Sequence, residues 1–220
     1  MKSTLVALSL LLTSPTCWAT EDDPHRFAAT IGYASQSGES SLIPVQLGDG
    51  YPPGSEIERG GNRGSAAASI SWYMTPRVAL ELWGKGSSES SVEIDVENGP
   101  DVGVARYSTR HASLSVQYHF LKAIDGERIV ATPFVGVGYG KVSVSNVSSN
   151  AQLGYGSLEV EGSNGLALVL GMDLALGERW FLRGDARRLT WTGTSTLQAA
   201  RLTDEKQNLL IYGVSLGRRF

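Results

Sequence analysis

Cysteine is almost absent from this sequence. Of 220 residues only Cys17 is a cysteine, and it lies in a segment that we expect to be removed from the mature protein. The mature chain would then have no disulfide, no thiol nucleophile and no thiolate metal ligand. A chain long enough for one domain must therefore be held together by something other than cross-links.

Long apolar runs and basic runs are missing as well. Beyond the N-terminal segment no stretch reaches the roughly 18 apolar residues of a membrane-spanning helix. A membrane is not excluded, because a transmembrane strand needs only about 9–11 residues with one apolar face. The formal net charge is −3 and Lys and Arg form no cluster, so we expect no nucleic acid among the partners.

The N-terminus, MKSTLVALSLLLTSPTCWATEDD, has the three parts of a secretory signal. Lys2 supplies the positive charge, an apolar stretch follows, and small residues precede a cleavage site after Ala19. We therefore expect residues 1–19 to be removed and residues 20–220 to form a single domain. A buried N-terminal helix and a lipid-modified Cys17 are the alternatives.

The main feature of the remaining chain is a period of two in hydrophobicity, which is typical of strands with one apolar face. Eight segments alternate in this way. They are RFAATIGYASQ, SAAASISWYM, RVALELWGK, HASLSVQYHF, PFVGVGYGKV, GLALVLGMDLAL, RWFLRGDARRLTW and the C-terminal YGVSLGRRF.

The connections between these segments alternate in length. Those at 37–63, 87–105, 145–164 and 192–207 are long, whereas 75–76 and 176–179 are tight turns. Residues 121–131 are intermediate, with Asp125-Gly126 as the expected turn. Short turns on one side and long loops on the other predict an all-β fold, an eight-stranded antiparallel transmembrane β-barrel with both termini in the periplasm.

A soluble β-sandwich or lipocalin-like barrel is the alternative fold, but the polar edges of the strands suit an apolar core poorly. We expect them to line a small barrel interior. The candidate lining residues are Tyr73, Glu81, Trp83, Lys85, Phe134, Asp173, Phe181, Arg183, Asp185, Arg187 and Arg219. The charged members suggest either a conduit or an ion-pair network that plugs the interior, and the aromatic members either a constriction or space filling.

The apolar edges carry aromatic residues where we expect the turn-side ends of the strands. Such residues form girdles at the membrane surface, so outer-membrane lipid is an expected partner. The expected girdle consists of Trp72, Tyr118, Phe120, Trp180, Tyr212 and Phe220.

Few residues suggest catalysis or metal binding. His25, His111 and His119 are too scattered for a metal site. His111 and Ser113 lie two apart on one strand face, where a His can activate a Ser, and some small outer-membrane barrels deacylate lipid A in this way. Both alternate with the apolar residues of their strand, however, and so should face the barrel interior. No orienting acid is evident either, so we expect no enzyme and no cofactor.

The second half of the chain resembles the outer membrane protein W (OmpW) family and related eight-stranded barrels. The resemblance lies in SVQYHF, TPFVGVGYGKV, GLALVLGMDLALGERWFLRGDARRLTW and LLIYGVSLGRRF. The terminal Phe220 after alternating apolar residues resembles the insertion signal read by the barrel-assembly machinery. That resemblance implies this machinery and periplasmic chaperones as partners during insertion into the bacterial outer membrane.

The resemblance also implies a function. OmpW-like barrels suggest a route for small hydrophobic molecules, which enter near the loops and leave laterally. An interior of eight strands is just wide enough for side chains, which argues against a general porin. An adhesion or envelope-structural protein anchored by the barrel, and the lipid A-modifying enzyme, are the alternatives.

Overall fold

The structure, a computed structural model, describes residues 26–37, 56–60, 64–95, 102–120, 124–126, 129–149, 158–161, 163–197 and 200–220. Every regular element in these ranges is a β-strand. No helix there is long and apolar enough to span a bilayer. The expected signal peptide and most of the connection 37–63 lie outside the described residues, so cleavage after Ala19 stays a prediction.

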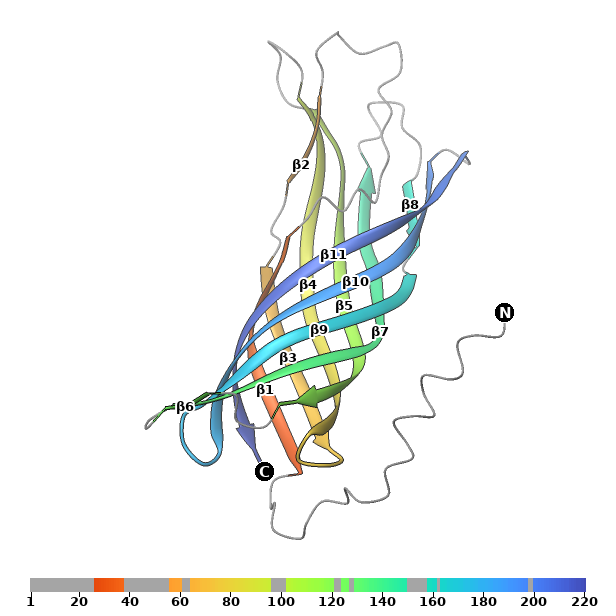
Figure 1. Ribbon diagram of the computed structural model, residues 1–220. Helices are drawn as coiled ribbons and strands as arrows, with labels where there is room; N and C mark the ends of the chain where they lie inside the picture. The colour runs from red at the N-terminus through yellow and green to blue at the C-terminus, as the bar shows by residue number, and fades with distance from the viewer. Residues whose placement is uncertain are drawn as a thin grey trace, which may run out of the picture.

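Eight strands form a closed antiparallel ring, which confirms the predicted fold class (Figure 1). The ring closes where the first strand pairs with the last. There the Phe27 and Phe220 backbones exchange hydrogen bonds of 3.4 and 2.8 Å. In ring order the strands are β1 (Phe27–Ser37), β3 (Gly64–Tyr73), β4 (Val78–Asp95), β5 (Val102–His119), β7 (Ile129–Ser149), β9 (Ser163–Ala175), β10 (Trp180–Leu197) and β11 (Ala200–Arg219).

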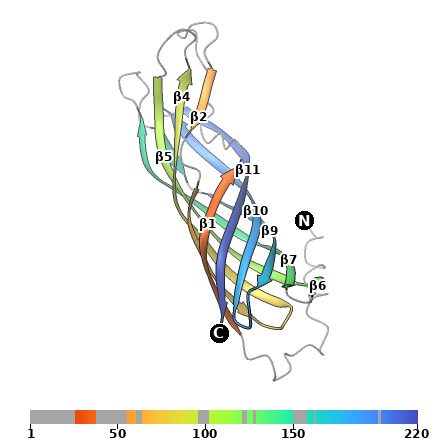
Figure 2. The same cartoon turned by 90° about the vertical axis from the view of Figure 1, so that its left-hand side faces the viewer.

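Three short strands extend this ring at its two ends. β2 (Glu56–Gly60) pairs with the far end of β4, and β8 (Leu158–Glu161) pairs with the far end of β10. β6 (Ile124–Gly126) pairs with the first residues of β7 at the end of the barrel that carries the tight turns. We call that end the turn end and the opposite one the loop end (Figures 1 and 2).

Side chains alternate between the two faces of the wall, as the period of two predicted. Leu170 and Val214 are 61% and 59% exposed on the outer face, whereas Glu81 is fully buried inside. The outer face is therefore apolar and the inner face mostly polar, which is the arrangement that a bilayer requires.

The apolar outer band ends toward the loop end where exposed cations begin. On β5 and β7, Arg110 and Lys141 follow the exposed Leu114 and Tyr139. From Tyr118 to Arg110 the strand covers about eight residues, or roughly 20 Å of height at the usual rise and tilt. This is close to the about 25 Å of an outer-membrane apolar band.

The two tight turns have local causes. Thr75 Oγ1 accepts hydrogen bonds from the backbone N–H groups of Arg77 and Val78, at 3.2 and 3.0 Å. In the turn before β10, Gly177 has a φ of +136°, a conformation that favours glycine. Both turns lie where the sequence predicted them.

The strands run further toward the loop end than their composition predicted. The expected loop 87–105 is strand up to Asp95 and again from Val102, and the expected loop 192–207 is almost all strand. Ladder hydrogen bonds continue there beyond the apolar band, where no lipid demands apolar side chains. At the turn end, Asp125 and Gly126 belong to β6 instead of the predicted turn.

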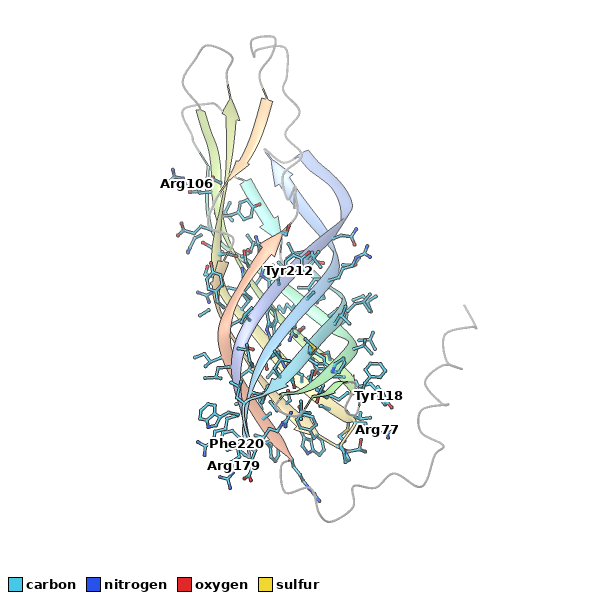
Figure 3. All side chains as sticks on the ribbon, turned by 60° about the vertical axis from the view of Figure 1, so that its left-hand side comes forward. Arg77, Arg106, Tyr118, Arg179, Tyr212 and Phe220 are labelled. Carbon is cyan, nitrogen blue, oxygen red and sulfur yellow. The ribbon has the colours of Figure 1, made fainter. Side chains whose placement is uncertain are left out.

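The aromatic girdle is largely where it was expected. Trp72, Tyr118, Phe120, Trp180 and Phe220 are all exposed near the turn end. Tyr212 is exposed too, but it lies well along β11 toward the loop end, so its predicted place in the girdle was wrong (Figure 3). Exposed Phe27 at the start of β1 was not predicted as part of the girdle.

Toward the loop end, the ladder pairing between described strands stops at two places in the wall. β7 pairs with β9 only as far as Val142–Ser163, and β8 pairs with β10 and not with β7. β11 pairs with β1 only as far as Leu210–Ser37. At the loop end the described strands thus form two groups joined by ladders, β2–β4–β5–β7 and β8–β10–β11. We call the two places where no ladder joins these groups the seams.

Candidate functional site: the barrel interior

The centre of the interior is held by Arg183 on β10. Its Nε and Nη2 donate to the two carboxylate oxygens of Asp173 on the neighbouring β9, at 2.7 and 2.9 Å. Its Nη1 donates to Glu81 Oε1 at 2.7 Å. All three side chains are at most 1% exposed, so each charge depends on the others for compensation.

Arg187, the next inward arginine on β10, extends the same network. Its Nη1 donates to Glu81 Oε2 at 2.8 Å and its Nε to Asp185 Oδ2 at 2.6 Å. Gln117 Nε2 on β5 also donates to Glu81 Oε2, at 2.7 Å. Glu81 therefore receives hydrogen bonds from both arginines and from Gln117. We call Glu81, Gln117, Asp173, Arg183, Asp185 and Arg187 the plug.

The plug crosses the full width of the barrel. Glu81 lies on β4, and both arginines lie on β10. These strands are opposite each other in the ring, with β5, β7 and β9 between them on one side and β3, β1 and β11 on the other. Side chains from opposite walls therefore meet across the interior at this level, which agrees with the small interior of an eight-stranded barrel.

Aromatic rings pack beneath the plug at the turn end. The Arg183 guanidinium lies 4.6 Å from the Phe134 ring centroid and 5.4 Å from that of Phe181. The His119 ring stacks on Phe134 at 5.0 Å and lies 5.2 Å from Tyr73. These cation–π and ring contacts fill the space below the ion pairs. Arg219, 5.1 Å from the Phe181 ring, completes the layer.

An apolar cluster lies on the loop-end side of the plug. Trp83 follows Glu81 among the inward residues of β4, and the Arg187 guanidinium stacks 4.5 Å from its ring. Leu189 follows Arg187 on β10 in the same way. The buried members of this apolar cluster are Ala34, Ala67, Trp83, Ala167, Leu189, Leu209 and Ile211.

Next to this cluster, β4 carries the buried Lys85. A register shift between Lys85 and Ser88 marks a β-bulge at Gly86–Ser87, and both bulge residues are exposed. The bulge turns Ser88 inward, where Lys85 Nζ donates to its Oγ at 2.8 Å. Ser88 Oγ also lies 3.2 Å from Thr109 Oγ1.

His111 and Ser113, the pair that suggested lipid chemistry, both face inward. They are 4% and 3% exposed, so neither can meet a membrane lipid from the outer wall. His111 Nδ1 and Ser113 Oγ have no hydrogen-bond partner among the described residues, and no acid orients the histidine there. Within the same residues, no group of three or more metal-ligating side chains is arranged to hold an ion. His25 lies outside the described residues.

All eleven sequence candidates face the interior, but the structure divides them among different layers. Lys85 lies apart from the plug, and Trp83 belongs to the apolar cluster. The turn-end side of the plug holds four more candidates, Tyr73, Phe134, Phe181 and Arg219. Arg183 and Asp185 form no direct pair, since each binds another partner.

Sequence reasoning missed several interior residues as candidates. Gln117, Leu189 and Ile211 are at most 2% exposed and contact the plug or the apolar cluster. The parity of Gln117 already placed it inside, because it alternates with the outward Val116 and Tyr118. Alternation also places Leu189 and Ile211 inside, but their residue type gave no reason to single them out, because apolar residues were expected to face outward.

Comparisons with known proteins extend this description. The family model described as OmpW family matches residues 45–220. Among solved structures, the outer membrane protein OprG from Pseudomonas aeruginosa has a TM-score of 0.66 and 17% identity, over 89% of this chain and 96% of that one. The outer membrane protein AlkL has a TM-score of 0.57 and 20% identity, over 89% of this chain and 90% of that one. The E. coli outer membrane protein W has a TM-score of 0.50 and 17% identity, over 90% of this chain and 100% of that one.

No curated protein is a significant match to the chain. At these low identities, the solved structures support the fold alone, and all three are outer-membrane proteins. The family match covers most of the chain and reaches well into its first half, beyond the segments that carried the resemblance. The chain therefore belongs to the OmpW family and is an eight-stranded β-barrel of the bacterial outer membrane.

Proposed function

We propose that this barrel admits small hydrophobic molecules from the outside of the cell. They enter between the loops, rest against the apolar cluster and leave sideways through the wall into the membrane. The observation that carries the proposal is the order of layers in the interior. An apolar cluster faces the loop end, and directly beneath it a charged plug spans the barrel from β4 to β10.

The plug decides the direction of travel. A hydrophobic molecule gains free energy by leaving water for the apolar cluster, at about 25 cal/mol per Å² of buried apolar surface. It would lose that gain on entering a dry set of ion pairs, whose hydrogen bonds it cannot replace. The axial path is therefore unfavourable, and a sideways exit remains.

The seams supply a place for that exit. The seam between β7 and β8 begins beside Lys141, at the loop-end edge of the apolar band, so a molecule that leaves there enters the membrane at its outer surface. β7 and β8 lie close together but the described strands have no ladder to break there, and beyond Leu210–Ser37 β11 has no ladder partner on its β1 side. Widening either seam therefore costs fewer backbone hydrogen bonds than parting paired strands elsewhere in the wall. The proposed path needs no covalent chemistry, and the inward pair His111 and Ser113 takes no part in it as a nucleophile and base.

Entry of a neutral hydrophobic dye tests the proposal. N-phenyl-1-naphthylamine fluoresces on reaching an apolar membrane interior, so vesicles with lipopolysaccharide in their outer leaflet report its entry rate. We expect this protein to raise that rate. Leu189→Gln should lower the protein-dependent rate about fivefold or more, because it places an amide in the apolar cluster. Arg188→Gln, an outward neighbour on the same strand, is the matched control.

Two results would contradict the proposal. One is a dye entry rate that is the same with and without the protein. The other is faster delivery of a small solute into the vesicle interior after Asp173→Asn. That substitution removes a plug charge while keeping its shape, so such a gain would mean that solutes travel along the axis.

A further inference from the structure

Lys85 is a buried cation outside the ion-pair network. It is 4% exposed, and every ion pair of the described interior joins other residues. Among the described residues, its ammonium group has one hydrogen-bond partner, the neutral hydroxyl of Ser88. An ammonium group has three donors, and burying its charge costs several kcal/mol unless a negative group compensates it.

The surroundings of Lys85 are built from several strands. Ser88, turned inward by the bulge, lies 3.5 Å from Gln36 Oε1 on β1 and 3.2 Å from Thr109 Oγ1 on β5. His111 is the direct cross-strand neighbour of Lys85, is 4% exposed, and leaves Nδ1 without a partner within the described chain. We call these five side chains the polar pocket.

The bulge shows that this grouping is not a result of simple alternation. On an unbroken strand, residues 85 and 88 would face opposite sides of the wall. The extra residue at Gly86–Ser87 puts both inside. Bulges often re-aim a side chain next to a functional site.

Apolar surface adjoins the polar pocket. Trp83 is the inward residue next to Lys85 on β4, and Ala34 is next to Gln36 on β1. Both belong to the apolar cluster, together with Leu189 on the facing strand β10 and Ile211 on β11, the cross-strand partner of Gln36. One contiguous region thus offers a cation and hydrogen-bonding groups on one side and apolar side chains on the other.

We infer that the polar pocket binds the carboxylate of a small amphiphile whose hydrocarbon chain lies against the apolar cluster. Lys85 Nζ supplies the charge-assisted hydrogen bond, and the Thr109 hydroxyl and the Gln36 amide can donate further ones. This inference rests on the proposed function and narrows it, since molecules that carry an acidic head group and a short apolar chain become the preferred cargo.

Binding measured without transport tests this inference. Decanoate with a 13C label at its carboxylate is titrated into the full barrel in nanodiscs, and empty nanodiscs give the background. Decanol carries the same chain without charge, and acetate carries the charge without a chain. We expect decanoate to bind at least about tenfold more tightly than either, because only decanoate can use both halves of the site.

Substitutions then locate the site. Lys85→Met keeps the length and should weaken decanoate at least about tenfold, while decanol changes by less than about twofold. Lys85→Arg should retain most of the preference. The matched control is Lys141→Met, which removes an exposed lysine from the outer face of β7. Heat-modified gel mobility verifies that each variant is folded, and Ser88→Ala, a milder change, should weaken decanoate in the same direction.

Equal binding of decanoate and decanol by the unmodified protein would overturn the inference. An unchanged affinity for decanoate in Lys85→Met would also overturn it, because Lys85 would then not bind the carboxylate. The proposed function fails by a different readout, the entry of the neutral dye. If the protein raises dye entry but does not prefer decanoate over decanol, the proposed function stands and this inference is wrong.

Discussion

Arg183 and Asp173 form a two-point ion pair across the paired strands β10 and β9, with contacts of 2.7 and 2.9 Å. Both side chains are almost completely buried. The third guanidinium nitrogen of Arg183, Nη1, donates to Glu81 on the opposite wall. Arg183 thus connects β10 to its neighbour β9 and to β4 on the opposite side of the barrel.

A double-mutant cycle measures the coupling free energy between Arg183 and Asp173. We expect Arg183→Met and Asp173→Asn each to destabilise the barrel, by up to about 3–5 kcal/mol, because each leaves a buried charge without its partner. The two changes together should cost less than the sum, with a coupling free energy of about 1–3 kcal/mol. Urea unfolding from lipid vesicles gives each value.

The same cycle with Asp185→Asn provides the comparison. Asp185 binds Arg187 and makes no direct pair with Arg183, so its coupling to Arg183 should be the smaller of the two. A larger coupling for Asp185 than for Asp173 would contradict the partners described above.

Gly171 and Gly184 lie on neighbouring strands but should respond differently to alanine. A Cβ at Gly171 would press on the Phe134 ring and lie 2.8 Å from the Gly184 carbonyl oxygen, whereas a Cβ at Gly184 would meet nothing within 4 Å. We expect Gly171→Ala to cost about 1–3 kcal/mol of unfolding free energy. Gly184→Ala should stay within about 0.5 kcal/mol. Similar losses at both sites would show that backbone freedom, not ring contact, governs the cost.

Leu170 tests the membrane face. It is 61% exposed on the outer wall, at mid-height in the apolar band. Leu170→Arg should destabilise the barrel by about 2–4 kcal/mol in a bilayer, because the charge must then enter hydrocarbon. The control is Arg110→Leu at the edge of the band, where the change should be small. No loss for Leu170→Arg in lipid vesicles would argue against a lipid-facing β9.

Phe220 is expected to act in assembly more than in stability. Its ring is 56% exposed, while its backbone pairs with Phe27 and helps close the ring. We expect Phe220→Ser to lower the yield of folded barrel in outer-membrane preparations several-fold, because the assembly machinery would read the terminal ring. Phe120→Ser alters another exposed aromatic at the turn end and should reduce that yield far less. Equal losses would assign both residues to the girdle only.

The sequence predicted the wall better than the interior. Alternation placed Leu170 and Val214 outside and Glu81 inside, because a closed sheet has only two faces. Partner choice in the interior was not predictable in the same way. Alternation assigns no partner to Arg183, which binds Asp173 and Glu81, because ring order and the reach of a long side chain decide which charges meet.

The bulge on β4 shows a second limit. Strict alternation turns Ser88 outward, and its surroundings were expected to be loop. One extra residue reversed its direction and created the neighbourhood of Lys85. Such an insertion leaves no mark in hydrophobic periodicity when the residues involved are Gly and Ser, which suit either face.

The ladder between β1 and β11 joins the first and last of the described strands. A ribosome-bound or truncated polypeptide therefore cannot complete the ring, however many strands it already contains. A fragment without β1 or β11 leaves two strand edges unpaired, and unpaired edges favour aggregation.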